Sequence, residues 1–250
     1  MMQRFDGKVA FVTGAAAGIG RATAERLASE GAALFLVDVA REGLEETAKL
    51  CAERGASVEQ RLCDVSDEGQ VKECIAACVA HHGRLDVLCN IAGILLLEHF
   101  DQIPLEKFRR VLEVNLVGTF ALCQAALPHL LESGGNIVNT SSTSALAGMP
   151  YGAAYGTSKG GVSALTRTLA VEFGKKGVRC NAVVPGSIQT AMAGGGLLPE
   201  DADMRLVMRA MALDKPRGPE AIAAVVAMLA SDDGAHINGE EIRVDGGTLS

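Results

Sequence analysis

Seven short apolar segments, separated by helical patterns, most strongly limit what this chain can fold into. Most of these segments are continuous apolar runs without the alternation of a half-exposed strand. Strands that are apolar on both faces belong in parallel sheets covered by helices on each side. The sequence therefore predicts an α/β fold, a doubly wound parallel seven-stranded sheet with helices on both faces and right-handed crossovers.

The pattern assigns each expected element to a residue range. The expected strands are 8–13, 32–37, 57–62, 86–90, 135–140, 178–184 and 241–244. The expected helices are 18–30, 41–54, 66–82, 104–114, 115–133, 153–176 and 219–230. Ser66 is the expected N-cap of its helix, which should stop at Gly83. No linker or repeat divides residues 1–250, so the sequence predicts a single domain.

Residues 187–214 form the least regular stretch of the chain. They contain Gly194-Gly195-Gly196, and three glycines disfavour a helix. A disordered surface insertion is one interpretation. The apolar residues of the stretch favour another, a mobile lid over a substrate cleft. These residues are Met192, Leu197, Leu198, Leu206, Met208 and Met211.

Charge and composition exclude several classes of protein. Lys and Arg number 23 against 30 Asp and Glu, a net charge of −7, and no basic cluster is visible. Neither nucleic acid nor an anionic membrane is therefore an expected partner. Hydrophobic residues make up 48%, enough for a large core, and charged residues make up 21%, which argues against disorder.

The start of the chain and its cysteines indicate a cytoplasmic protein. The first apolar run, Val9–Thr13, is too short for a signal peptide, and the longest, Val87–Leu97, is too short for a membrane span. The seven cysteines are scattered and lack a C-x-x-C pair, as expected for reduced thiols. Cys74 and Cys78 share a helical face, but no His or third Cys completes a metal site. The sequence therefore predicts no metal.

A glycine-rich turn follows the first expected strand. Residues 13–20 read T-G-A-A-A-G-I-G, which has the spacing G-x-x-x-G-x-G. Glycines let the backbone approach a pyrophosphate at a helix N-terminus, where free N–H groups and the helix dipole favour anions. The expected cofactor-binding residues of this turn are Gly14, Ala17, Gly18, Ile19 and Gly20. A glycine-rich turn without a ligand is the alternative.

Asp38, at the end of the second expected strand, indicates which cofactor binds. Its carboxylate can accept hydrogen bonds from both ribose hydroxyls of NAD, and it would repel the 2′-phosphate of NADP. Ala17 and Val39 supply no positive charge nearby. The sequence thus predicts NAD in preference to NADP. Asp64 and Val65, after the third strand, are expected either to contact the adenine or to begin a helical turn with Asp64 as its cap.

A hydroxyl, a phenol and an amine come together at residues 142–159. Tyr155 and Lys159 are one helical turn apart, so their side chains project from the same face. Free tyrosine titrates near pH ~10, too high for a general base at neutral pH. A nearby cation favours the phenolate, so Lys159 could lower that barrier. The spacing alone is a weak signal, and it gains weight from Ser142, which stands in front of it.

Several motifs, in this order along the chain, resemble the classical branch of the short-chain dehydrogenase/reductase family. They are T-G-x-x-x-G-I-G at 13–20, D-V at 64–65, N-x-A-G at 90–93, the Asn of V-N-L at 115, S-S at 141–142, Y-x-x-x-K at 155–159, P-G at 185–186 and V-D-G-G at 244–247. The match covers essentially the whole chain and implies a Rossmann-like fold. One departure is visible, because the usual N-N-A-G has Ile91 in place of its second Asn. This change is expected to alter slightly how the central sheet braces the cofactor.

The resemblance implies a role for each residue of a catalytic group of four. Tyr155 is the general acid/base, Ser142 hydrogen-bonds the substrate oxygen, and Lys159 hydrogen-bonds the nicotinamide ribose and lowers the phenol pKa. Asn115 holds a water that links Lys159 to solvent. Further cofactor contacts are implied at Asn90, Ala92, Gly93, Pro185, Gly186, Ile188 and Thr190. The plainer alternatives are a polar strand end for Ser142, a cap between two helices for Asn115 and a solvated charge for Lys159.

These residues predict an NAD-dependent oxidoreductase that interconverts an apolar secondary alcohol and its ketone by direct hydride transfer. A 3-oxoacyl-thioester (acyl-carrier-protein) reductase is the alternative within enzymes, although such relatives usually use NADPH, which Asp38 disfavours. Outside enzymes the alternative is a catalytically silent nucleotide-binding scaffold, which need not keep all four catalytic residues. A serine hydrolase is disfavoured because no G-x-S-x-G stretch follows an expected strand, where a nucleophile elbow would stand.

Substrate and assembly are less constrained by the sequence. The expected substrate-pocket residues are Leu95, Ser144, Met149, Tyr151 and Met192. They are largely apolar and uncharged, so the expected partner is a small apolar alcohol or ketone. His99 is interpreted as a surface-loop residue in preference to one at the mouth of the pocket. The resemblance implies a homotetramer through the helices near 104–133 and 153–176 and through the C-terminal strand and helix. The apolar positions of the 153–176 helix fit core burial equally well.

Overall fold

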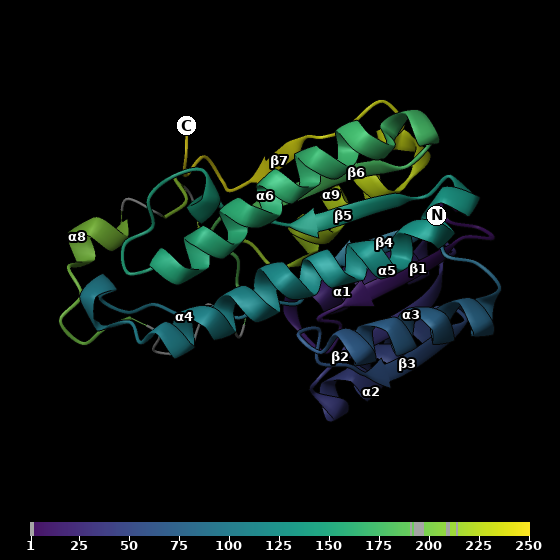
Figure 1. Cartoon of the computed structure of the whole chain (residues 1–250), viewed down its shortest axis with the longest axis horizontal. Coiled ribbons are helices and arrows are strands. Elements are labelled where there is room, and N and C mark those ends of the chain that lie inside the picture. Colours follow the sequence, from purple (N-terminus) through teal and green to yellow (C-terminus); the bar gives the residue numbers. More distant parts are fainter. Residues whose placement is uncertain (1–2, 191, 193–197, 209–210, 214) are drawn as a thin grey trace.

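The predicted seven-stranded parallel sheet is present in the computed structural model, which describes residues 3–190, 192, 198–208, 211–213 and 215–250 (Figure 1). The strands are β1 (Val9–Thr13), β2 (Ala33–Asp38), β3 (Val58–Leu62), β4 (Val87–Asn90), β5 (Asn136–Thr140), β6 (Arg179–Pro185) and β7 (Glu241–Val244). Each lies within one or two residues of its expected bounds.

The sheet has the order β3-β2-β1-β4-β5-β6-β7, and neighbouring strands are parallel throughout. The chain builds outward from β1 to β3 and then returns to place β4 on the other side of β1. This reversal creates a switch point between β1 and β4. The connections that follow these two strands run in opposite directions, so a crevice opens at the carboxyl ends of the strands. The arrowheads of β1 and β5 in Figure 1 point toward this end, where α8 also lies.

Helices cover both faces of the sheet, as predicted. The longer helices are α1 (Gly18–Ser29), α2 (Arg41–Ala52), α3 (Glu68–His82), α4 (Leu105–Leu112), α5 (Gly118–Ser133), α6 (Ala153–Phe173) and α9 (Glu220–Ala230). The shorter helical turns are 100–102, 143–145, 174–176, 232–234 and α8 (Met204–Val207). Residues of α1, α2 and α9 pack into one apolar core, and residues of α3, α5 and α6 pack into the other.

The strands divide their side chains between these two cores. Along β1, Ala10 and Val12 face the α1–α9 side, while Val9 and Phe11 face the α3–α5 side. Phe11 stacks on Phe35 of β2 with ring centroids 5.3 Å apart. Both faces of the central strands are therefore buried, which is the physical reason for their continuous apolar runs.

Two expectations about helix ends need correction. Ser66 is not the N-cap of α3, because the helix begins two residues later and the Asp67 carboxylate accepts the N–H of Gln70. The helix expected over 153–176 ends as an α-helix at Phe173 and continues as a tighter turn through Lys176. The predicted stop at Gly83 is confirmed, with this residue in the left-handed conformation (φ 78°).

The two helices expected at 104–114 and 115–133 form one continuous helix, joined by a π-helical turn over Glu113–Val117. Asn115 lies inside this turn, so the interpretation of Asn115 as a cap between two helices is wrong. By length and composition alone, Leu105–Ser133 could cross a membrane. Core helices of soluble proteins meet the same criterion, and Leu122, Ala126 and Leu130 pack on the sheet.

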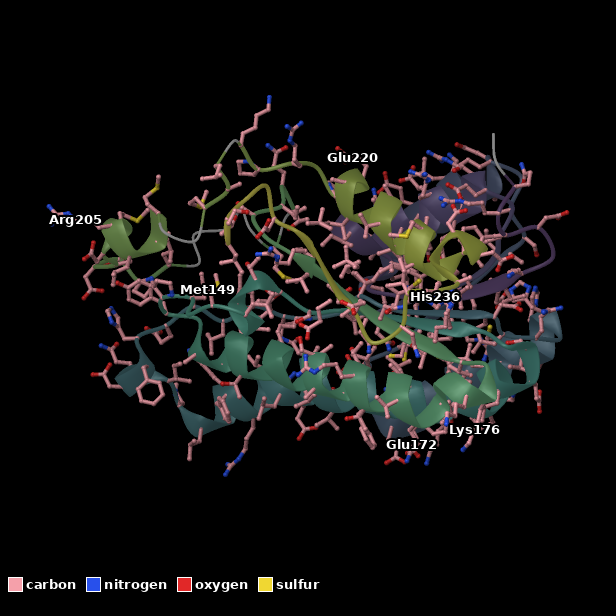
Figure 2. All side chains as sticks on the ribbon, turned by 90° about the horizontal axis from the view of Figure 1, so that it is seen from above. Met149, Glu172, Lys176, Arg205, Glu220 and His236 are labelled. Carbon is pink, nitrogen blue, oxygen red and sulfur yellow. The ribbon has the colours of Figure 1, made fainter. Side chains whose placement is uncertain are left out.

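The irregular stretch at 187–214 is only partly described. Residues 198–208 include α8, whose N-cap Asp203 accepts the N–H of Arg205. The Gly194-Gly195-Gly196 triplet, which argued against a helix, and Leu197, one of the apolar residues that favoured a lid, lie outside the described residues. Figure 2 shows Arg205 and Met149 at the same end of the molecule, far from Glu172 and Lys176.

Candidate active site

A cleft of about 790 Å³ opens at the carboxyl ends of the strands. The predicted site residues that line it are Gly14, Ala17, Gly18, Ile19, Gly20, Asp38, Ala92, Gly93, Leu95, Ser142, Ser144, Met149, Tyr155, Lys159, Pro185, Gly186, Ile188, Thr190 and Met192. The predicted site residues outside its lining are Val39, Asp64, Val65, Asn90, Asn115 and Tyr151. Elements that are far apart in sequence therefore bring most of the predicted site to one place.

Further lining residues were not assigned from the sequence. They include Ala40, Thr140, Thr143, Pro150, Ser187, Val207, Thr248 and Leu249. Thr140 and Ser187 adjoin motif residues near strand ends, so their position could have indicated them. Thr248 likewise adjoins the V-D-G-G motif at 244–247, whereas only the path of the chain after β7 brings Leu249 to the cleft.

The turn between β1 and α1 is shaped by close backbone approach. A Cβ on Gly14 would lie 2.9 Å from the Ala92 backbone, and one on Gly20 would lie 1.9 Å from the carbonyl oxygen of Gly14. The N-cap residue of α1, Ala17, has no side chain that could accept the first N–H groups of the helix. The helix therefore presents uncapped N–H groups to the cleft, which is the arrangement that binds phosphate.

Asp38 is held at the end of β2 by backbone donors. The N–H of Ala16 donates to Oδ2 at 3.0 Å, and the N–H of Ala40 donates to Oδ1 at 2.9 Å. Each carboxylate oxygen has a further lone pair, so the group can still accept two hydroxyl protons from a ligand. Val39 is not part of the cleft lining and is 67% exposed. The guanidinium of Arg41 lies 3.9 Å from the Glu45 carboxylate.

The Asp64 side chain is occupied by protein groups. Its Oδ1 accepts the N–H (3.0 Å) and hydroxyl (2.6 Å) of Ser66, and its Oδ2 accepts Nη2 of Arg110 at 3.0 Å. Asp64 thus starts a local turn, as the capping alternative expected, although Asp67 is the residue that caps α3. The adenine contact of Asp64 and Val65 stays a prediction.

Ser142 stands at the end of β5, where it caps the short turn 143–145. Its Oγ accepts the N–H of Ser144 at 3.2 Å. A hydroxyl whose oxygen accepts from the backbone keeps its own proton free to donate. Tyr155, in the first turn of α6, lies close enough for the Ser142 hydroxyl to lower the pKa of its phenol. This places a hydroxyl donor beside the phenol.

Lys159 lies one turn after Tyr155 and is only 3% exposed. Its Nζ donates to the carbonyl oxygen of Thr140 at 2.7 Å and is 5.7 Å from the centroid of the Tyr155 ring. Burial disfavours the ammonium and lowers the pKa of Lys159 to about 8. The interpretation of Lys159 as a solvated surface charge is therefore wrong.

The pKa of Tyr155 differs from the expectation that Lys159 lowers it. Burial raises the pKa of the Tyr155 phenol, and the hydrogen bond from Ser142 only partly opposes this. Burial therefore outweighs the effect that the spacing of Tyr155 and Lys159 predicted. A positive charge brought into the cleft by a ligand would add to Lys159 in stabilising the phenolate.

Asn115 does not line the cleft, but its hydrogen bonds hold residues next to the cleft in place. The side chain is fully buried; its Oδ1 accepts the N–H of Ile94 (2.8 Å), and its Nδ2 donates to the carbonyl of Ile94 (2.9 Å) and to Ser158 Oγ (3.0 Å). These bonds fix the segment that continues to Leu95 in the cleft. A Cβ on Gly93 would lie 3.2 Å from Asn115 Oδ1 and 3.5 Å from Lys159 Nζ. The water that the resemblance assigns to Asn115 stays a prediction.

Asn90 braces the sheet behind the cleft. Its Nδ2 donates to Asn139 Oδ1 at 2.8 Å and contacts Cys123 Sγ at 3.3 Å, so it links β4 to β5 and α5. The hydroxyl oxygen of Thr13 accepts the N–H groups of both Ile91 and Ala92, at 2.9 and 3.0 Å. The backbone hydrogen bond to Thr13 therefore holds Ile91 in place, and the Ile91 side chain packs against the apolar core.

The substrate half of the cleft is apolar. Its apolar lining residues include Leu95, Leu97, Met149, Pro150, Met192, Leu198, Val207 and Met211. The charged residues in the described lining are Asp38 and Lys159, and both belong to the expected cofactor half. Methionine side chains adapt their shape easily, so this half can fit apolar groups of different outline.

Tyr151 does not line the cleft. Its side chain instead connects two segments that flank the cleft. The residue has a positive φ of 63°, and its Oη accepts the N–H of Asp203 at 2.7 Å. Its ring meets that of His99 edge-on, with centroids 5.0 Å apart, and His99 Nε2 lies 2.8 Å from Asp201 Oδ1. These contacts tie the loop after β4 to the 198–208 segment. They raise the pKa of His99, chiefly through the hydrogen bond with Asp201.

The described part of the chain contains no set of side chains that could bind a metal ion. No group of three or more His, Cys, Asp or Glu side chains there could hold an ion. All seven cysteines are buried and free of disulfides. Cys74 and Cys78 both lie in the core on the α3 side of the sheet, where they pack as small apolar side chains.

Comparison with known proteins places this site in a family. A family model described as enoyl-(acyl carrier protein) reductase matches residues 14–248. Meso-2,3-butanediol dehydrogenase of Serratia marcescens is 39% identical over 247 residues, which cover 99% of this chain and 96% of that protein. The 3-oxoacyl-[acyl-carrier-protein] reductase FabG of Thermotoga maritima is 37% identical and covers 98% of this chain and 99% of its own.

A solved structure agrees over the same length. Carveol dehydrogenase of Mycobacterium avium, crystallised in complex with NAD, superposes with a TM-score of 0.91 at 30% identity and covers 99% of each chain. Both the sequence matches and the superposition extend across the sheet, the cleft and the Ser142–Tyr155–Lys159 group. The chain therefore belongs to the classical short-chain dehydrogenase/reductase family of oxidoreductases.

Proposed function

We propose that this protein is an NAD-dependent oxidoreductase that interconverts an apolar secondary alcohol and its ketone, with Tyr155 as the general acid/base. The observation that carries the proposal is the meeting of Ser142, Tyr155 and Lys159 at a cleft whose remaining described lining on that side is uncharged. A neutral substrate oxygen can reach these three groups without leaving a buried charge unpaired.

The cleft fits a dinucleotide. A Cβ at Gly14 or Gly20 would lie 2.9 Å or less from a neighbouring backbone segment, so only glycine allows this close approach beside the uncapped N-terminus of α1. This end would hold the pyrophosphate, and the Asp38 carboxylate would hold the adenosine ribose. Pro185, Gly186 and Ile188 line the other end. When bound there, the nicotinamide supplies or accepts the hydride.

The protein itself would move one proton. Ser142 donates its free hydroxyl proton to the substrate oxygen and holds that oxygen near the phenol. Tyr155 gives its proton to this oxygen when a ketone is reduced and takes a proton from it when an alcohol is oxidised. Lys159 has two N–H groups left after its bond to Thr140, and these can donate to a ribose hydroxyl.

Replacing Tyr155 tests the assignment of the base. Tyr155→Phe keeps the ring and removes only the hydroxyl, so kcat should fall by at least about 100-fold, in the usual range for general acid–base catalysis, while NADH binding stays unchanged. Secondary alcohols and ketones with NAD(H) are the substrates, and absorbance of the reduced ring is the readout. Undiminished turnover by the variant would show that another group moves the proton.

The preference for NAD rests on Asp38. Both its oxygens face donors, and the nearby cation Arg41 has Glu45 as a partner. The ratio of kcat/KM for NAD to that for NADP should exceed about 10, since repulsion of the 2′-phosphate at close range corresponds to 1–2 kcal/mol or more. Asp38→Ser, which removes the charge, should reduce this ratio. Higher efficiency with NADP in the unmodified protein would contradict the proposal.

A second candidate is reduction of 3-oxoacyl thioesters, which is favoured by the 37% identity to the Thermotoga maritima reductase. An acetoacetyl thioester, assayed with NADH and with NADPH, separates the two. Faster reduction of the thioester than of any simple ketone, with NADPH preferred, would support this alternative. The proposed function instead requires faster turnover of neutral apolar ketones with NADH.

We further propose that the protein is a single-domain cytoplasmic homotetramer whose 187–214 segment acts as a substrate lid. Seven reduced cysteines support the compartment. Exposed apolar side chains on the α4–α5 helix and on α6 support an interface, and they are Leu105, Val117, Phe120 and Val171. Sedimentation equilibrium tests the assembly, and a monomer at micromolar concentration would refute it.

A further inference from the structure

The last residues of the chain follow a fixed path back toward the cleft. After β7, the carboxylate of Asp245 accepts the N–H of Gly247 on Oδ1 at 3.1 Å and the N–H of Leu249 on Oδ2 at 3.2 Å. Gly246 and Gly247 both have positive φ, 60° and 81°, which residues with side chains rarely adopt. One carboxylate thus sets the direction of the C-terminal tail, residues 245–250.

The tail is wedged between the β6 turn and the lid segment. A Cβ on Gly186 would lie 2.8 Å from both Cα and Cβ of Asp245. On the other side, the N–H of Leu213 donates to the carbonyl of Gly246 at 3.1 Å. A Cβ on Gly247 would lie 2.8 Å from Leu213 Cδ1. The root of the tail therefore has little room to shift without moving one of these neighbours.

The outer end of the tail is tied down as well. The hydroxyl of Thr248 donates to the carbonyl of Asp245 at 2.7 Å, and Nη1 of Arg243 donates to the carbonyl of Leu249 at 2.9 Å. Thr248 and Leu249 are half-buried and line the cleft, whereas the final residue, Ser250, is exposed. A terminal segment without such contacts would fray into solvent.

Sheet order assigns these two residues to the substrate half. The adenosine end of the cleft lies at β2, where Asp38 is. The tail leaves β7, which is at the opposite edge of the sheet, and contacts the Pro185–Gly186 turn and the lid. Leu249 therefore adds to the apolar wall that Met211 and Val207 contribute from the lid side.

We propose that Thr248 and Leu249 form the C-terminal wall of the substrate pocket, that the Leu249 side chain limits the size of the carbon skeleton, and that Asp245 is the positioning residue for this wall. The proposal rests on the proposed function for its substrate class. The proposed determinant of substrate specificity lies more than 90 residues after Ser142 in the sequence.

Tryptophan fluorescence tests the position of the tail without any catalytic assay. The chain contains no Trp, so Leu249→Trp would carry the sole indole. We expect its emission to be blue-shifted and to be quenched by added NADH through energy transfer to the reduced ring. Ser250→Trp, one residue further on and exposed, is the matched control and should show a solvent-like emission. Identical emission wavelengths in the two variants would overturn the proposal.

The positioning role has its own variants. In the Leu249→Trp background, Asp245→Ala removes both acceptors and should shift the emission toward that of a solvated indole. Asp245→Asn keeps one carbonyl oxygen as acceptor and should restore part of the blue shift. If Asp245→Ala leaves the emission unchanged, Asp245 does not position the tail.

Selectivity tests what the wall does. Isopropanol and menthol, oxidised with NAD, differ mainly in carbon skeleton. Leu249→Ala should raise the menthol-to-isopropanol ratio of kcat/KM by about 10-fold or more, because one or more methylenes in an apolar pocket correspond to at least that discrimination. Leu249→Phe should lower the ratio, and Ser250→Ala should leave it unchanged. An unchanged ratio in both Leu249 variants would overturn the wall assignment.

The two experiments separate the inference from the function on which it rests. If the unmodified protein oxidises no secondary alcohol but the emission of Leu249→Trp is blue-shifted relative to that of Ser250→Trp, the tail lines the cleft and the proposed substrate class is wrong. If alcohols are oxidised and the Leu249 variants change neither emission nor selectivity, the proposed function holds and the tail assignment is wrong.

Discussion

Replacing the buried lysine of the active site should stabilise the protein while it abolishes activity. Lys159 is 3% exposed, and burial lowers its pKa from an ordinary 10.5 to about 8. Holding an ammonium in such surroundings costs free energy that the fold must supply elsewhere. Lys159→Met places an unbranched apolar side chain of similar length at the same position, so it removes the charge with little change in packing.

The magnitude follows from the two pKa values. The difference between 10.5 and about 8 corresponds to roughly 3 kcal/mol of destabilisation when the lysine is charged in both the folded and the unfolded chain. The variant also loses the hydrogen bond from Nζ to the Thr140 carbonyl, which offsets about 1–2 kcal/mol. We therefore expect Lys159→Met to be about 1–2 kcal/mol more stable at pH 7.

The pH dependence of unfolding tests separately whether Lys159 destabilises the fold. Since the folded pKa is lowered, the lysine destabilises the fold fully below pH 8, and this cost disappears as pH rises toward 10.5. The stability advantage of the variant should therefore shrink by roughly 2 kcal/mol between pH 7 and pH 9.5. Urea unfolding followed by circular dichroism at both pH values measures it. The matched control is Lys175→Met, which changes an exposed lysine and should show no such trend.

Activity supplies the other half of this prediction. The variant should lose at least about 100-fold in kcat, because Lys159 is the only cation in the described lining beside the phenol. A variant that is less stable than the parent at pH 7, or whose advantage is equal at both pH values, would refute the reasoning. In that case the burial of Lys159 would not be what lowers its pKa.

Three further predictions concern the frame of the site. Asp67→Ala removes the N-cap of α3 and should lower the free energy of unfolding by about 1 kcal/mol, measured in urea. Gly20→Ala places a Cβ 1.9 Å from the Gly14 carbonyl and should cost about 3 kcal/mol or more, seen as a lower melting temperature. His99 has a raised pKa, so its pairing with Asp201 should weaken as pH rises through that pKa, and tryptic cleavage within the paired segment should accelerate. His99→Gln should abolish this trend, and an equal trend in the variant would show that another group causes it.

The buried lysine illustrates why this site carries a stability cost. Its ammonium and the uncapped N–H groups of α1 can still donate hydrogen bonds to acceptors on a ligand. Ligand binding should therefore stabilise the protein strongly, and a shift of melting temperature with NAD would report it. The same shift with NADP, if much smaller, would add a measure of cofactor choice that does not depend on turnover.

Local sequence was enough to predict the architecture. The apolar runs of β1, β2 and β4 reflect burial on both faces, and each lies within two residues of its predicted bounds. The glycine spacing of the first turn and the one-turn separation of Tyr155 and Lys159 are likewise local properties. Both identified cleft residues without knowledge of the remaining chain.

Contacts between distant segments decided the rest. Asn115 turned out to be buried behind the wall and bonded to Ile94, 21 residues earlier, so its part in a helix junction could not be judged from its neighbours. Tyr151 faces the lid segment because of a bond to Asp203 across 52 residues. Whether the pKa of Tyr155 is raised or lowered depends on how deeply the phenol is buried. The spacing of residues in the sequence does not show this burial.

The sequence by itself determined the order of elements, the sheet and the residues at its carboxyl ends, because backbone periodicity and glycine geometry act over a few residues. Tertiary structure alone decided which of those side chains face the cleft, how burial shifts their proton affinities and which distant segment closes the pocket. Burial and long-range hydrogen bonds are properties of the packed molecule. For this reason the C-terminal Leu249 became visible as a cleft residue only when the chain was folded.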